Sequence, residues 1–156
     1  MKTRFVQKKL ASFAMFLLLA IASTPAFSQG VSMKDIYAKG ETLLNYIEDE
    51  YGYEVVHIEY DIITSSKTIT RRLTTPYTYT IVGFADDRVK DLDIIVYQRK
   101  GNAWKEVKRD EEEDSTPVVS FKPAASGDYR IEIKVYKYNP GASAAHYGLI
   151  FSHDIP

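Results

Sequence analysis

The sequence predicts an all-β domain, a jelly-roll-like antiparallel β-sandwich of about eight strands, preceded by one N-terminal helix after a cleaved signal peptide. Three observations lead to this prediction. Apolar and polar residues alternate with a period of two in most runs after Gly52, which is typical of antiparallel strands with one dry and one wet face. Turn residues separate these runs. No helical pattern lies between them, so parallel β-α-β units are not expected.

The first 28 residues have the three parts of a secretory signal peptide. Four basic residues stand within the first nine, an apolar stretch runs from about Phe13 to Ala22, and small residues precede Gln29. Polar residues and a proline end the apolar stretch before the roughly 20 residues that a membrane span needs. We therefore expect cleavage near Ser28–Gln29, a secreted or periplasmic protein, and no transmembrane anchor after cleavage. The chain then divides into a signal peptide (1–28), a helix (29–52) and a β-sandwich domain (53–156).

The mature chain has a mildly acidic, cysteine-free composition. Removing 28 residues from 156 leaves 128, which suits one domain. The removed segment holds four of the 20 basic residues and none of the 21 acidic ones, so the mature chain carries 16 basic residues and a net charge of −5. This charge argues against a nucleic-acid partner, which calls for a basic face. Without disulfides, stability must come from an apolar core, and a bound ion could add to it.

The segment before Gly52 has the pattern of an amphipathic helix. Ser32 and Asp35 stand at capping-box spacing. Apolar residues then recur on one face, at Ile36, Leu43, Leu44 and Ile47. Gly40 costs such a helix about 1 kcal/mol relative to alanine, and Gly52 is a natural stop signal.

Eight short runs after Gly52 have the pattern of strands. They occupy residues 54–63, 68–73, 78–84, 91–98, 103–107, 118–121, 128–137 and 147–151. The run "DYRIEIKVYK" is the clearest, because its odd-numbered residues from Tyr129 to Val135 are apolar and most of its even-numbered ones are charged. Gly101 can close a hairpin between the fourth and fifth runs. Tyr60, Tyr129 and Tyr147 fall at inward positions and are expected in the core.

Four motifs follow one another in an order that is similar to a known family. They read "YTYTIVGFADD", "DLDIIVYQRKG", "SGDYRIEIKVY" and "HYGLIF". Together they resemble the bacterial pre-peptidase C-terminal domain family over residues 77–151. The resemblance implies a jelly-roll-like sandwich that acts as a non-catalytic accessory module of secreted hydrolases, with calcium or an extracellular polymer as the ligand of some members. This chain departs from the family in having no catalytic domain, and its helix and first two strands have no counterpart in the family pattern.

A cluster of aspartates could bind calcium. Asp91 and Asp93 are two residues apart on one strand and therefore point to the same face, while Asp86 and Asp87 lie in the turn before it. Calcium takes six to eight oxygen ligands, and these four carboxylates could supply several. The alternative is structural: the aspartates form the polar outer side of a strand whose apolar residues face inward.

Three aromatic residues could form a ligand-binding surface. Tyr97 shares a strand face with Asp93, Tyr136 follows the polar side of its strand, and Trp104 lies in the run paired across the hairpin. Flat rings on a sheet are surfaces on which sugars or protein partners stack. The alternative is that Trp104 anchors the core and the tyrosines cover the edges of a small sandwich.

Catalytic patterns are weak, so we expect no enzyme. The sequence has no G-x-S-x-G motif, and His57, His146 and His153 lack the spacing of a helical zinc pair. The expected function is that of a secreted non-catalytic binding or accessory module that engages an extracellular polysaccharide or an envelope protein through a sheet face. Two alternatives stay open. One is a calcium-stabilised structural or interaction module, and the other is a small secreted hydrolase with a histidine held by a carboxylate near a serine.

Overall fold

The computed structural model describes residues 32–155, so the predicted signal peptide and its cleavage site lie outside the described residues. The helical part consists of helix α2 (Met33–Asn45) and a π-helical turn, η1 (Tyr46–Glu50). The strands are β1 (Glu54–Ile63), β2 (Ser66–Leu73), β3 (Tyr79–Ala85), β4 (Val89–Lys100), β5 (Ala103–Arg109), β6 (Val118–Phe121), β7 (Gly127–Tyr138) and β8 (Ala145–His153). Within this part of the chain, no helix is long and apolar enough to cross a membrane.

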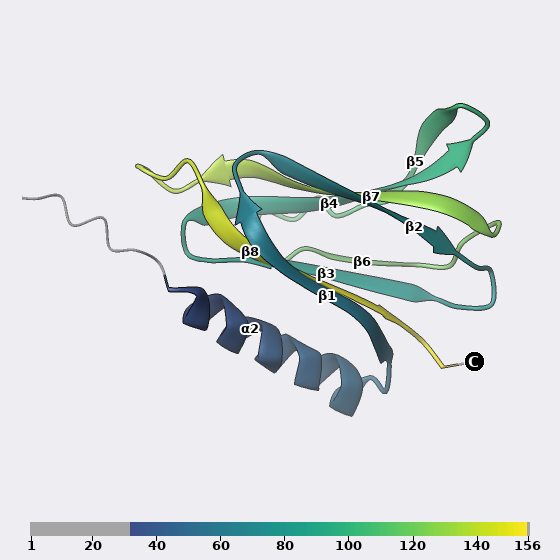
Figure 1. Cartoon of the computed structure of the whole chain (residues 1–156), viewed down its shortest axis with the longest axis horizontal. Helices are drawn as coiled ribbons and strands as arrows, with labels where there is room; N and C mark the ends of the chain where they lie inside the picture. The colour runs from purple at the N-terminus through teal and green to yellow at the C-terminus, as the bar shows by residue number, and fades with distance from the viewer. Residues whose placement is uncertain (1–31, 156) are drawn as a thin grey trace, which may run out of the picture. The chain divides into compact units, whose positions relative to one another are not determined.

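The eight strands form two four-stranded antiparallel sheets. Sheet A has the order β1-β8-β3-β6, and sheet B has the order β2-β7-β4-β5. The first strand therefore pairs with the last, the second with the seventh, the third with the sixth and the fourth with the fifth. This nested pairing is that of a jelly roll, so the predicted fold class is confirmed. Figure 1 shows the two sheets as stacked layers, with the β4–β5 hairpin projecting away from them.

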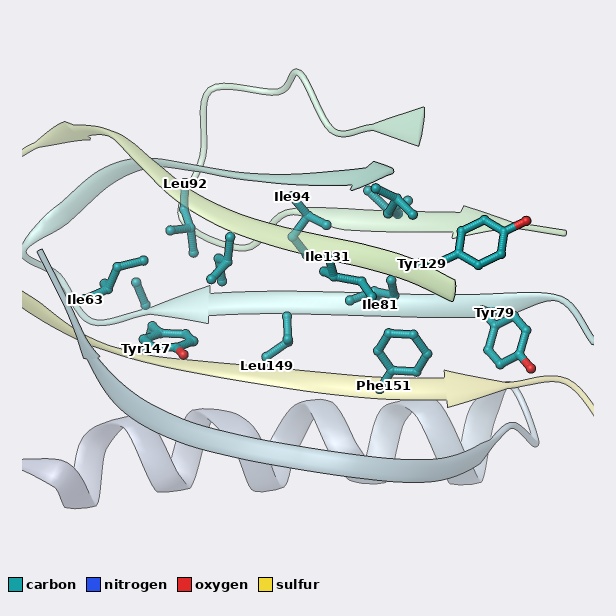
Figure 2. Close-up of a cluster of buried hydrophobic side chains, with 14 of the residues drawn as sticks. Ile63, Tyr79, Ile81, Leu92, Ile94, Tyr129, Ile131, Tyr147, Leu149 and Phe151 are labelled. Atoms are coloured by element: carbon teal, nitrogen blue, oxygen red, sulfur yellow. The ribbon is translucent and has the colours of Figure 1, made fainter. Parts of the chain in front are cut away.

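The main core lies between the sheets. Sheet B contributes Leu92, Ile94 and Ile131, and sheet A contributes Ile81 and Leu149, all of them at most 1 % exposed. Figure 2 shows these side chains interdigitating from the two sides. The period-two pattern of the sequence produces this core directly, because alternate residues of every strand point to the same face.

A second apolar layer joins α2 to the outer face of sheet A. It consists of Ile36, Ile47, Val82, Phe84 and Ile150, with partly buried neighbours that include Tyr60. The hydroxyl of Ser32 accepts a hydrogen bond from the Lys34 N–H at 3.1 Å and caps the helix. The prediction that Tyr60 shares the inward core positions of Tyr129 and Tyr147 is therefore wrong, because its ring packs beneath the helix. Strand β3 is buried on both faces for the same reason.

The two outer faces of the sandwich are thus not equivalent. Helix α2 covers the outer face of sheet A, as the lower part of Figure 1 shows. No helix in the part of the chain that the structure describes packs against the outer face of sheet B. The strand edges at β1 and β2 also stay free of a further strand within residues 32–155.

Candidate functional site

Two of the three predicted ligand-binding aromatics lie together on the outer face of sheet B. The register places Arg130 of β7 between Thr70 of β2 and Tyr97 of β4, and it places Glu106 of β5 opposite Tyr97. Trp104 occupies the next outward position of β5. A row across all four strands is thus formed by Thr70, Arg130, Tyr97 and Glu106, and Trp104 lies one outward position away from it along β5.

Arg130 joins the two rings. Its guanidinium carbon lies 4.5 Å from the ring centroid of Tyr97 and 5.2 Å from that of Trp104, which are cation–π distances. The hydroxyl of Tyr97 donates a hydrogen bond to Glu132 at 3.1 Å, and burial, followed by this hydrogen bond, raises the pKa of Tyr97. The Nε of Arg130 is buried without a hydrogen-bond partner among the described residues. We call Tyr97, Arg130 and Trp104 the aromatic–arginine stack.

The third predicted aromatic lies apart from the stack. Tyr136 is 51 % exposed near the other end of β7, and the ammonium of Lys134 lies 4.3 Å from its ring centroid. Trp104 is outside the core between the sheets, so it does not anchor that core. The structure thus brings Tyr97 and Trp104 together through Arg130, and it leaves Tyr136 as a separate exposed ring on the same strand as Arg130.

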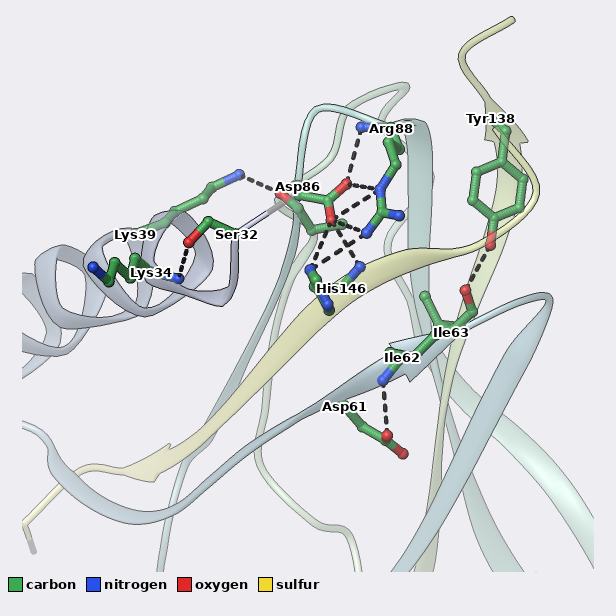
Figure 3. Close-up of polar contacts among 11 residues, drawn as sticks. Ser32, Lys34, Lys39, Asp61, Ile62, Ile63, Asp86, Arg88, Tyr138 and His146 are labelled. Carbon is green, nitrogen blue, oxygen red and sulfur yellow. Dashed lines mark hydrogen bonds and ion pairs between the residues drawn. The ribbon is translucent and has the colours of Figure 1, made fainter. Parts of the chain in front are cut away.

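The four predicted calcium ligands are divided between two environments. Asp86 is buried and faces Arg88, which donates to its carboxylate from Nη2 at 2.6 Å and from Nε at 3.0 Å. The N–H of His146 adds a bond at 2.8 Å, as Figure 3 shows. Burial acts to raise the pKa of Asp86, but these hydrogen bonds outweigh it and hold the pKa below its ordinary value. This carboxylate is already satisfied, and Asp87 is exposed beside it.

Asp91 and Asp93 lie in a less favourable environment. Asp93 is only 6 % exposed, and burial together with the neighbouring carboxylates of Asp91 and Asp110 raises its pKa. Burial also raises the pKa of Asp91, whose Oδ1 has no hydrogen-bond partner within residues 32–155. No group of three or more histidine, aspartate or glutamate side chains in the described chain is arranged to hold a metal ion. Calcium binding at the four aspartates therefore stays a prediction.

A groove that the sequence pattern does not predict opens between the free edges of β1 and β2. It has a volume of about 730 Å³ and is lined by Val56, His57, Glu59, Ile69, Thr70, Arg71, Arg72, Leu73, Tyr79, Phe151 and His153. We call it the β1–β2 groove. Its sequence signal is the placement of Arg71 between Ile69 and Leu73, at a position that the alternation of β2 turns inward.

The β1–β2 groove contains a histidine beside a carboxylate. The Nε2 of His57 lies 3.5 Å from Glu59, whose other carboxylate oxygen accepts a hydrogen bond from the hydroxyl of Tyr147. The hydroxyl groups among the lining residues belong to Thr70 and Tyr79, and no serine of residues 32–155 lines the groove. The arrangement expected for a small secreted hydrolase, with a serine beside the pair, is therefore not formed here.

Comparisons with known proteins give likenesses of fold alone. No protein-family model and no curated protein matches the sequence. Among solved structures, the chain is similar to the pre-peptidase C-terminal domain of a Bacillus anthracis collagenase, with 9 % identity, a TM-score of 0.47, and coverage of 61 % of this chain and 87 % of that one.

Two further solved structures have comparable scores. PliG from Aeromonas hydrophila, a periplasmic inhibitor of g-type lysozyme, has 16 % identity and a TM-score of 0.45, with 67 % of this chain and 90 % of that one covered. The Yersinia pseudotuberculosis-derived mitogen has 17 % identity and a TM-score of 0.47, with the same two coverages. A pre-peptidase C-terminal domain is thus one of the structures that this chain is similar to, and membership of that family stays a prediction.

Proposed function

We propose that this protein is a secreted or periplasmic, non-catalytic binding module that docks onto an extracellular polysaccharide through the outer face of sheet B. The observation that carries the proposal is the aromatic–arginine stack on the sheet face that α2 leaves open. The predicted signal peptide supplies the expected location.

The chemistry of this face suits a sugar chain. Sugar rings present C–H faces that pack on aromatic rings and hydroxyl groups that bond to planar polar side chains. The stack offers both, because the rings of Tyr97 and Trp104 flank the guanidinium of Arg130. Carboxylates and cations alternate around it, with Arg99 lying 3.6 Å from Asp128 and Arg109 lying 2.7 Å from Glu106. Such a mixed face favours hydrogen bonding to hydroxyl groups over bulk charge attraction.

The proposal is tested by affinity electrophoresis and by pull-down on insoluble polysaccharides, with protein purified after export of the full chain. Substituting Tyr97→Ala and Trp104→Ala should weaken binding of the polysaccharide at least tenfold, which corresponds to about 1.4 kcal/mol. Tyr46→Ala is the matched control, because Tyr46 is a 52 % exposed aromatic residue of η1, away from the outer face of sheet B. Equal binding by the double variant, or binding of an envelope protein instead of any polysaccharide, would overturn the proposal.

A calcium-stabilised structural module is a second candidate. It is favoured by the buried Oδ1 of Asp91, which has no hydrogen-bond partner among the described residues, and by the raised pKa of Asp93, which burial and neighbouring carboxylates produce. A divalent cation at this point would stabilise both ionised carboxylates. This candidate and the polysaccharide-binding module involve different residues and are tested independently.

A further inference from the structure

Arg71 is the least satisfied charged residue of the β1–β2 groove. Its position in β2 lies in phase with Ile69 and Leu73, so its side chain enters the space between the sheets. Its Nε is buried without a hydrogen-bond partner in the described chain. Across residues 32–155, no carboxylate lies within ion-pair distance of its guanidinium. Burying a cation without a partner lowers the free energy of unfolding. A fold that keeps such a cation is therefore expected to use it for binding.

The surroundings hold Arg71 in place without neutralising it. Its guanidinium carbon lies 5.5 Å from the ring centroid of Phe151, a cation–π contact that leaves the charge intact. The one carboxylate that residues 32–155 contribute to the lining, that of Glu59, accepts a hydrogen bond from the hydroxyl of Tyr147 and lies 3.5 Å from His57. Arg72 adds a second cation to the lining. The groove therefore attracts an anion, and a guanidinium pairs with a planar carboxylate through two parallel hydrogen bonds.

The size and position of the groove indicate which molecule carries the carboxylate. A volume of about 730 Å³ lies within the range of small-molecule sites. Thr70 lines the groove and also stands opposite Arg130 in the register of sheet B. A bound polymer that crosses the sheet from Trp104 over Arg130 to Thr70 therefore reaches the free edge of β2 and enters the groove. The aromatic–arginine stack and Arg71 lie along one continuous path.

We infer that the β1–β2 groove binds the carboxylate of an acidic sugar, a uronate, and that Arg71 is the residue that pairs with it. The choice of a sugar as the carrier rests on the proposed polysaccharide function, whereas the carboxylate site rests on Arg71 and the groove alone. The polymer recognised by this protein then contains uronate units, and its neutral sugars stack on Tyr97 and Trp104.

The probe is D-glucuronate, titrated into the exported protein and followed by amide chemical shifts in NMR spectra. Glucuronate should shift the amides of residues 56–59 and 69–73, while glucose, which lacks the carboxylate, should leave them in place. Arg71→Gln should abolish the shifts. Arg71→Lys should weaken binding several-fold, because lysine keeps the charge but lacks the planar guanidinium. Lys34→Gln should bind glucuronate as the wild type does. Lys34 is exposed on the helix and serves as the control.

A stability measurement separates binding from folding. Because the guanidinium is unpartnered in the described chain, Arg71→Met should raise the melting temperature while it abolishes binding of glucuronate. A lower melting temperature would assign Arg71 a structural role and overturn the inference, as would wild-type binding by Arg71→Gln. Larger amide shifts with an N-acetylated dipeptide than with glucuronate would show that the groove prefers a peptide carboxylate, and the sugar as carrier would then be wrong.

The polymer assay distinguishes failure of this inference from failure of the proposed function. If Trp104→Ala abolishes binding of an acidic polysaccharide and Arg71→Gln does not, the sheet face binds and the groove inference fails. If Arg71→Gln abolishes binding and Trp104→Ala does not, the groove binds and the proposed role of the stack fails.

Discussion

Gly40 of α2 and Phe84 of β3 are in direct contact across the helix–sheet interface. A Cβ built at residue 40 would lie 2.9 Å from the Cζ of Phe84 and would overlap the hydroxyl of Tyr60. The glycine therefore lets the helix approach sheet A closely enough to bury the apolar layer between them.

Gly40→Ala should destabilise the protein even though alanine is the better helix former by about 1 kcal/mol. Overpacking a filled interface costs about 1 to 3 kcal/mol, and the ring of Phe84, which the added methyl group would meet, is fully buried. Urea unfolding gives the free energy of unfolding. The control is Ala38→Gly, an exposed helix position where only propensity changes. An increase in stability on Gly40→Ala would show that the interface is loose.

Asp86→Asn should lower the free energy of unfolding by about 2 to 3 kcal/mol, because it leaves Arg88 without its carboxylate partner. The effect depends on pH. Hydrogen bonds from Arg88 and His146 outweigh burial and depress the pKa of Asp86, so its contribution is present above the ordinary value of 3.8 and is lost as the pH falls through the folded-state value. Chemical unfolding should therefore show a larger difference between variant and wild type at pH 7 than at pH 3. Asp87→Asn, at the exposed neighbouring position, should have little effect at either.

Asp93→Asn should stabilise the protein at pH 7 in the presence of a chelator, by about 1 kcal/mol. Burial and the nearby carboxylates raise the pKa of Asp93, so the folded state holds its proton more tightly than the unfolded state does. The free energy of unfolding then falls as the pH rises from the ordinary pKa of 3.8 through the raised pKa of the folded state. The variant has no ionisable group here and avoids this loss. The gain should vanish near pH 3, where both forms are neutral. A destabilised variant at pH 7 would mean that the ionised carboxylate has a stabilising partner.

Excess calcium should raise the melting temperature by several degrees if the aspartates bind it, because a ligand specific to the folded state stabilises by mass action. The measurement is a thermal melt with calcium and then with chelator. Substituting Asp91 and Asp93 should remove the shift, whereas substituting Asp61, an exposed aspartate on β1, should retain it. An unchanged melting temperature of the wild type would exclude the calcium-stabilised module.

Export of the full chain should yield a protein that begins at Gln29. Intact mass spectrometry and N-terminal sequencing of the purified protein measure this directly. The expectation follows from the small residues before position 29 and from the basic and apolar regions that precede them. The uncleaved chain, produced in the cytoplasm, serves as the size standard. An exported product of that full mass would contradict the predicted signal peptide.

Local patterns predicted most of the fold. The bounds of β1 and β6 agree with the sequence runs 54–63 and 118–121, because alternation and turn residues act within a few positions of the chain. The face that each residue occupies was harder to predict. Tyr60 and Phe84 alternate as core residues do, yet they pack beneath α2, and only the tertiary arrangement decides which face of a sheet a helix covers.

The site was predicted in part for the same reason. Tyr97 and Trp104 were recognised from their strand faces, but the guanidinium of Arg130 between them depends on the pairing of β4 with β7. Arg71 was not predicted, although it is a charge at an inward position of its strand, because the groove around it exists only through the placement of β1 and β2 at edges of different sheets.

The pairing of β1 with β8 also has a consequence for when the domain can fold. Ile58 lies opposite Ile150, so the first strand finds its partner only after almost the whole domain has been synthesised. Contacts this distant along the chain slow folding, to milliseconds or seconds in comparable β-sandwiches. We expect a nascent chain that lacks its last strand to remain unfolded, with β1 and β3 unable to join in one sheet. Slow folding of this kind would favour the export that the predicted signal peptide implies, because the chain stays extended until its last strand has been made.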